Sequence, residues 1–246
     1  MLSLEASASD NDRKKKHSIR RIGRIAELVN AKAYLEVGVA LGRTFRFLDF
    51  PRKVGVDPNF KFDYEAHRRD GIDFFEMTSD DYFSDKAGSD KFDIIFLDGL
   101  HVFAQTYRDF ENSIAHAHDR TVWLIDDVVP SDELSSLPNR GEVRRRRREM
   151  GIESGVWHGD IYKVMFAIHD FHPEYSFVTI KGGGNPQSIV WKAKRENVKP
   201  ALGSMQAIEQ LDYAEFVKRK ETLNLRTEEE AMQILAASLQ RQSAPA

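Results

Sequence analysis

The chain of 246 residues contains no cysteine. This absence excludes disulfides, thiolate nucleophiles and thiolate-bound zinc or iron–sulfur centres, and it leaves the redox state of the compartment undetermined. Long hydrophobic runs are missing too, since no apolar stretch approaches the ~20 residues that a membrane helix needs. The N-terminus lacks the apolar core of a secretory signal. We therefore expect a soluble, cytoplasmic protein with no membrane partner.

A large excess of one charge is also absent. The sequence has 36 Lys and Arg against 39 Asp and Glu, a formal net charge of −3. Nothing in this balance provides the broad positive field that holds nucleic acid, so any polyanion site has to be local. Apolar residues make up 41% of the chain, which is ordinary for a globular protein.

Short apolar runs alternate with amphipathic segments, a rhythm typical of βαβ units. It predicts an α/β, Rossmann-like doubly wound sheet, mostly parallel with a C-terminal antiparallel hairpin. We divide the chain into a flexible tail (1–17), the Rossmann-like domain (18–198) and a C-terminal helical extension (199–246) that packs on the domain or on another copy. Expected strands cover 34–37, 54–57, 73–77, 92–98, 121–125, 176–180 and 188–192. Expected helices cover 18–29, 43–50, 103–117 and 161–169, with another after the capping box at Thr227 and Glu230.

A glycine turn follows the first expected strand, in the sequence Glu36-Val37-Gly38-Val39-Ala40-Leu41-Gly42. Such a turn lets backbone approach a ligand at a helix N-terminus. It departs from the G-x-G-x-x-G dinucleotide fingerprint, which disfavours a nicotinamide cofactor. The turn resembles the first motif of class I S-adenosylmethionine (SAM)-dependent methyltransferases, with Ala40 where the middle glycine is usual. The resemblance implies that Gly38 and Gly42 wrap the methionine half of SAM and that Glu36 helps to hold its amino group.

Other cofactor contacts are predicted at the ends of the next strands. Asp57 lies where a carboxylate can take both ribose hydroxyls of a nucleoside, which suits either cofactor class. Ser79 and Asp80 follow the third expected strand and match, loosely, the region that lies along adenine in the methyltransferases. The alternative for Glu36 and Asp57 is a solvated strand end.

Three carboxylates, those of Asp98, Asp126 and Asp127, end two apolar runs that are neighbours in sequence. Parallel strands would bring them to one edge of a sheet. Oxygen donors without cysteine suit a hard cation, magnesium first, with calcium and manganese as alternatives. Otherwise one aspartate caps a helix and the others face water. His101, three residues after Asp98, is expected in the first turn of the next helix, where it is either a general base or simply exposed.

This set resembles metal-dependent sugar O-methyltransferases of the macrocin and mycinamicin type and their cephalosporin-hydroxylase-like relatives. The resemblance spans roughly residues 34–192. It implies that Asp98, Asp126 and Asp127 bind magnesium, that Asp98 also lies at the cofactor, and that His101 is the catalytic base. The segment from Trp157 to Lys163 resembles these relatives too, but we expect Asp160 and Lys163 to form a structural pair.

Five consecutive arginines, 144–148, follow the fifth expected strand. Charge runs are usually solvated helices. The functional alternative is that they meet an anionic acceptor such as a nucleotide sugar or phosphorylated glycan, because arginine matches phosphate oxygens.

The leading hypothesis is therefore a SAM-dependent, divalent-metal-assisted O-methyltransferase acting on a small hydroxylated acceptor, such as a sugar or glycan precursor. Two alternatives remain open at this point. One is a non-catalytic nucleotide-binding or scaffold protein with a Rossmann shell. The other is a metal-dependent hydrolase or hydroxylase that uses the same acids.

Overall fold

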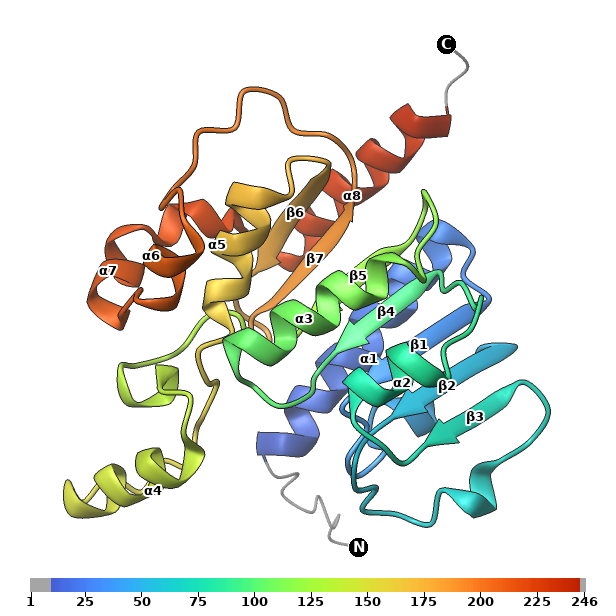
Figure 1. Cartoon of the computed structure of the whole chain (residues 1–246), viewed down its shortest axis with the longest axis horizontal. Helices are drawn as coiled ribbons and strands as arrows, with labels where there is room; N and C mark the ends of the chain where they lie inside the picture. Colours follow the sequence, from blue (N-terminus) through green and yellow to red (C-terminus); the bar gives the residue numbers. More distant parts are fainter. Residues whose placement is uncertain (1–9, 244–246) are drawn as a thin grey trace, which may run out of the picture.

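The two apolar runs that end in aspartate form β4 (Ile94–Leu97) and β5 (Val122–Ile125), and every residue of both strands is buried. Their side chains alternate between two hydrophobic clusters, one on each face of the sheet. A strand covered on both faces has no polar side, which is why these runs are continuously apolar. The computed structural model, which describes residues 10–243, places them at the centre of the molecule (Figure 1).

The sheet has eight strands in the order β3-β2-β1-β4-β5-β7-β6-β8. The strands from β3 to β5 pair in parallel, whereas β7 pairs antiparallel with β5 and with β6. The predicted doubly wound sheet with a C-terminal antiparallel hairpin is therefore confirmed. The remaining strands are β1 (Ala33–Val37), β2 (Arg52–Val56), β3 (Ile72–Phe75), β6 (Tyr175–Ile180), β7 (Gln187–Lys192) and β8 (Leu225–Arg226).

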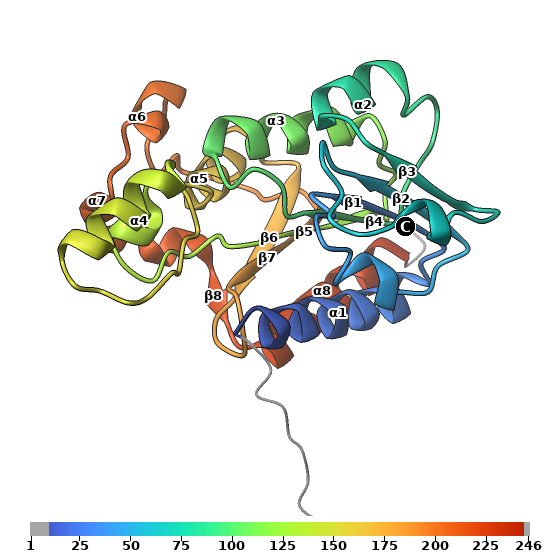
Figure 2. The ribbon, with the colours of Figure 1, turned by 90° about the horizontal axis from the view of Figure 1, so that it is seen from below.

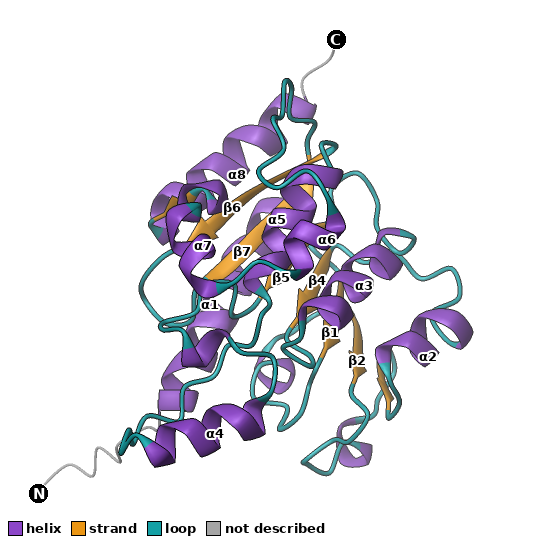
Figure 3. Ribbon diagram, turned by 60° about the vertical axis from the view of Figure 1, so that its left-hand side comes forward, coloured by secondary structure: helices purple, strands orange, loops and turns teal. Residues whose placement is uncertain are grey.

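Helices cover both faces of the sheet (Figure 2). One layer contains α2 (Ser79–Asp85), α3 (Phe103–Ile114), α5 (Tyr162–Phe171), α6 (Met205–Glu209) and α7 (Tyr213–Lys218). The other contains α1 (Asp10–Val29) and α8 (Glu228–Ser243), which lie side by side. Helix α4 (Arg140–Glu149) extends at one end of the molecule (Figure 3). Among residues 10–243, no helix is both long and apolar enough to cross a membrane.

Three expectations about the elements need correction. Helix α1 begins at Asp10, so residues 10–17 belong to a helix and not to the tail; lysine and arginine favour helix, and extending a formed helix costs little. Residues 1–9 lie outside the described part. The helix expected over 43–50 is only a 3-10 turn, Phe45–Phe47, because the buried Lys53 Nζ donates hydrogen bonds to the carbonyl oxygens of Phe45 and Leu48. The C-terminal extension is not helical throughout, since β8 joins the sheet beside β6.

The two terminal helices are joined by an ion cluster around Glu228. Its Oε2 accepts from Arg21 Nε at 3.0 Å, and Arg20 binds the same carboxylate. Arg21 is fully buried. Partial burial opposes the ionisation of Glu228, but Arg20 and Arg21 outweigh it and lower its pKa from 4.5 to about 2.

Replacing Glu228 with glutamine is expected to destabilise the protein by about 1–2 kcal/mol at pH 7, after discounting for solvent screening. Because the folded-state pKa is depressed, this contribution is complete above the unfolded value of 4.5 and is lost as pH falls toward 2. Thermal or urea unfolding of both proteins between pH 7 and pH 3 measures it. Glu229→Gln is the matched control, since Glu229 is 64% exposed; an equal loss in both variants would contradict the proposed role of the buried cluster.

Candidate active site

The site lies at the carboxyl ends of β1 and β4, where the strand order reverses and open α/β sheets place their ligands. Gly38 follows β1 with φ +93°, and a Cβ there would lie 2.1 Å from the Asp98 carbonyl oxygen. Only glycine lets these two loops approach so closely. The contact brings the glycine turn and the acidic edge together as two sides of one site.

Two cavities share the Gly38 and Asp98 backbone. One, of about 310 Å³, is lined by Asp57, Thr78, Ser79, Gln105 and Asp109, among others. The second, of about 520 Å³, is acidic; it contains Glu36, Asp98, His101, Asp126 and Asp127. We call them the smaller cavity and the acidic cavity. A larger groove beside β6, β7 and α8, of about 1000 Å³, contains none of the predicted site residues.

In the smaller cavity, two backbone N–H groups hold the carboxylate of Asp57 in a fixed position. Asp57 Oδ2 accepts from the Ala40 N–H and Oδ1 from the Asn59 N–H, both at 2.8 Å. Ala40 has φ +45°, a left-handed conformation that costs a non-glycine residue energy and explains why glycine is usual at this position of the motif. The turn is therefore held in place by the acid at the end of the next strand.

The other predicted residues of the smaller cavity fall into two groups. Ser79 lines the cavity, and its Oγ donates to Asp109 at 2.6 Å. Asp80 does not line it, because its carboxylate turns outward to Arg108. Burial raises the pKa of Asp109, although Ser79 and Gln105 donate to it.

Glu36 lines the acidic cavity, whereas Gly42 lines neither cavity. Glu36 is almost fully buried and accepts a hydrogen bond of 2.6 Å from the Tyr34 hydroxyl, so it is not the solvated strand end considered above. Gly42 has φ +66°, and a Cβ there would lie 2.9 Å from both Arg46 and Phe62. The glycine is thus needed for the turn.

In the acidic cavity the His101 ring lies between two carboxylates. Nδ1 is 3.1 Å from Asp127 Oδ2, and Nε2 is 3.3 Å from Asp98 Oδ1. Burial of the ring disfavours its charged form, but Asp127 and Asp98 outweigh this and raise the pKa of His101 to about 10. The prediction that His101 lies in the first turn of the next helix was wrong. Helix α3 starts at Phe103, and His101 precedes it with φ +35°.

Backbone strain is concentrated at this histidine. His101 and Asp127, at φ +58°, both have left-handed backbones although neither is glycine. Such strain persists only where the surroundings enforce it. Gly159 does so here, because a Cβ on it would lie 1.7 Å from the His101 carbonyl oxygen. Asp160 fixes the start of α3 by accepting from the Phe103 N–H at 2.7 Å, and it pairs with Lys163 at 3.3 Å as expected.

Asp126 differs from the other two acids. Its Oδ1 accepts from Gln187 Nε2 at 2.9 Å and its Oδ2 from Asn185 Nδ2 at 3.3 Å. Gln187 is itself fixed by Arg21, whose Nη1 donates to its Oε1 at 2.8 Å. The carboxylate is therefore held toward β7. Within residues 10–243, no three His, Cys, Asp or Glu side chains form a ready metal-binding group.

Several site residues escaped the sequence analysis. Asp109 and Gln105 reach the smaller cavity from α3, and Trp157 and Arg140 form a wall of the acidic cavity. The Trp157 ring stacks on His101 at a centroid distance of 5.3 Å. Gln105 and Asp109 could have been found from their spacing, because they are polar residues one turn apart on the helix that follows β4. No local pattern marked Arg140.

With this geometry in place, the fold and the site are similar to those of class I SAM-dependent methyltransferases. Residues 35–128 match the protein family described as "Methyltransferase domain", and that segment contains the glycine turn, Asp57, Asp98, His101 and both later aspartates. Comparison with curated proteins gives no significant match. The family match favours the methyltransferase hypothesis over the scaffold and hydrolase alternatives.

Solved structures show the same fold. A protein from Staphylococcus aureus assigned as a caffeoyl-CoA O-methyltransferase is 19% identical, with a TM-score of 0.51; the match covers 72% of this chain and 83% of that one. An O-methyltransferase from Bacillus cereus in complex with SAH is 17% identical, with a TM-score of 0.50, and the match covers 78% and 84% of the two chains.

Proposed function

We propose that the protein transfers a methyl group from SAM to the hydroxyl oxygen of a small acceptor. The observation that carries this proposal is the meeting of two cavities across one backbone contact, that of Gly38 with Asp98. One cavity has the features of a nucleoside site and the other presents a histidine held by carboxylates. That the solved structures of like fold include O-methyltransferases supports an oxygen acceptor.

The residues of the smaller cavity fit the adenosine part of SAM. Asp57, fixed by two backbone N–H groups, is placed to accept from the ribose hydroxyls. Ser79, Gln105 and Asp109 offer polar atoms to the base. When bound, SAM supplies an electrophilic methyl group on a sulfonium. The cationic amino-acid end would reach the acidic cavity, where Glu36 favours a positive charge.

His101 is proposed to take the proton from the acceptor hydroxyl. Asp127 holds its ring in one orientation toward a positioned acceptor, and Gly159 packs on its backbone. The ring accepts a proton only in its neutral form, which requires that the negative charge of Asp98 and Asp127 be neutralised. Trp157 covers one side of the ring and restricts the access of water. The chain's own contribution is thus orientation of the acceptor and removal of its proton.

Asp98 and Asp127 fit a divalent cation, whereas Asp126 fits it less well. Asp127 Oδ1 is buried and accepts no hydrogen bond from the described residues. Magnesium is often held by one or two carboxylates, with waters and substrate oxygens completing its shell. When bound there, it would neutralise the two carboxylates and lower the pKa values of the acceptor hydroxyl and of His101. Asp126, already holding two amides, serves better as a support.

Chelation tests the metal. Exhaustive treatment with EDTA is expected to abolish transfer from radiolabelled SAM while leaving SAM binding, measured by calorimetry, unchanged, because Asp57 and the glycine turn contain no metal ligand. Adding back magnesium should restore transfer. Undiminished transfer after chelation would exclude the metal, and failure of SAM to bind at all would exclude the proposed function. A sugar acceptor, cytoplasmic location and self-association through the terminal helices stay predictions.

A further inference from the structure

Helix α4 carries six arginines, and their partners divide them into two groups. Three are neutralised within the chain. These pairs are Arg145 with Glu149 at 2.8 Å, Arg146 with Glu142 at 2.5 Å, and the buried Arg147 with Asp132 at 2.8 Å. Three of the five arginines in the run 144–148 therefore have a structural explanation, as the solvated-helix interpretation requires.

Arg140 lies outside the run and lacks a carboxylate partner among the described residues. Arg144 follows it one helical turn later and has none either. Burial and the charge of Arg144 both lower the pKa of Arg140. Like charges four residues apart destabilise a helix. The chain neutralises three arginines of α4 but leaves Arg140, Arg144 and Arg148 without a carboxylate partner among the described residues. This leaves positive charge available for a ligand.

The position of Arg140 identifies where that ligand would lie. Its guanidinium lies over the Trp157 ring at 5.6 Å, and the same indole stacks on His101 at 5.3 Å. Trp157 Nε1 donates to the Leu137 carbonyl at 2.7 Å, which fixes the ring. Arg140 also lines the acidic cavity, with Leu41 and Leu100 at its edge. A cation, an indole and the catalytic histidine thus follow one another along one wall.

We infer that Arg140 binds an anionic group of the methyl acceptor, a carboxylate, phosphate or sulfate carried on the same small molecule as the reacting hydroxyl. Arginine matches such oxyanions with two parallel hydrogen bonds. The wall then orients the acceptor: the anion is attracted by Arg140 at one end, so the hydroxyl end points to His101 at the other. This inference deepens the proposed function and rests on it for the identity of the ligand.

Trp157 provides a test that needs no known acceptor. Of the three tryptophans, Trp123 and Trp191 are buried and Trp157 is partly exposed. At constant ionic strength, the anion iodide should quench the fluorescence of Trp157 more than the cation caesium does. Inorganic phosphate should reduce the quenching by iodide. Arg140→Gln is expected to reduce iodide quenching about twofold to fivefold, the effect of removing one nearby surface charge. Trp157→Phe should remove the quenchable signal.

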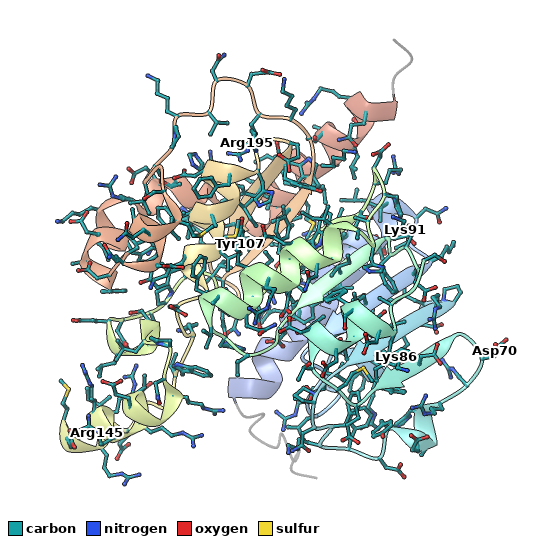
Figure 4. The ribbon with its side chains drawn as sticks, in the orientation of Figure 1. Asp70, Lys86, Lys91, Tyr107, Arg145 and Arg195 are labelled. Atoms are coloured by element: carbon teal, nitrogen blue, oxygen red, sulfur yellow. The ribbon has the colours of Figure 1, made fainter. Side chains whose placement is uncertain are left out.

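Arg145→Gln is the matched control, because it removes the same charge from the same helix. Arg145 pairs with Glu149 and lies on α4 at the edge of the molecule (Figure 4). Equal quenching in the two glutamine variants, or no preference for iodide over caesium in the wild type, would overturn the inference. Calorimetry with SAM distinguishes failure of the Arg140 inference from failure of the proposed function. Normal SAM binding without a preference for iodide would reject only the role of Arg140. A preference for iodide without SAM binding would reject the methyltransferase proposal.

Discussion

Replacing His101 with alanine is expected to lower methyl transfer by about 10²–10⁴-fold, the usual contribution of a general base, while SAM binds normally. His101 lines the acidic cavity and does not line the smaller one, so turnover and cofactor affinity should separate. Single-turnover transfer from labelled SAM, with calorimetry of SAM binding, measures both quantities.

His118→Ala is the control for this variant. His118 also contacts an aspartate, Asp93, at 3.0 Å, but at the start of β4, the opposite edge of the sheet. It should retain full turnover. If His101→Ala retained activity, the base assignment would be wrong even with the methyltransferase function intact; if both variants lost SAM binding, the separation of the two cavities would be wrong instead.

Replacing Gly38 with alanine is expected to abolish SAM binding and to destabilise the protein by about 2–5 kcal/mol. The new Cβ would lie 2.1 Å from the Asp98 carbonyl oxygen, at a φ of +93°. A left-handed conformation costs about 1–2 kcal/mol, and overpacking adds about 1–3 kcal/mol. Urea unfolding and calorimetry measure the two effects. They should occur together because the same contact joins both cavities.

Gly23→Ala is the matched control for Gly38→Ala. Gly23 lies within α1, and no atom outside its own helix lies within 4 Å of a Cβ built there. Alanine at this position should stabilise the helix by about 0.5–1 kcal/mol. A Gly38→Ala protein that folded stably and bound SAM would show that the close approach of the two loops is dispensable.

Much of this site could be predicted because strand ends are local features. Apolar runs followed by Glu36, Asp57 and Asp98 predict buried strands that deliver acids to one edge, and the sheet places all three there. The glycines of the turn could be recognised because their spacing is a property of the chain itself. What the strand ends could not predict is the direction in which each carboxylate points.

The remaining features depend on contacts between distant segments. Asp126 turns toward Gln187, 61 residues away, and nothing near either residue indicates the pairing. His101 lies before α3, whose start is fixed by Asp160, 57 residues from Phe103. Arg140 differs from the other arginines of α4 in lying over the Trp157 ring, 17 residues further along the chain. Sequence periodicity contains no information of this kind, which emerges when the chain is folded.

The buried Arg21 has a consequence for how the protein is made. Its guanidinium supports Gln187, and through it Asp126, but its counterion Glu228 lies 207 residues further along the chain. During synthesis the cation therefore lacks its partner until α8 has left the ribosome. The support of the acidic edge is therefore completed only when α8 docks beside α1.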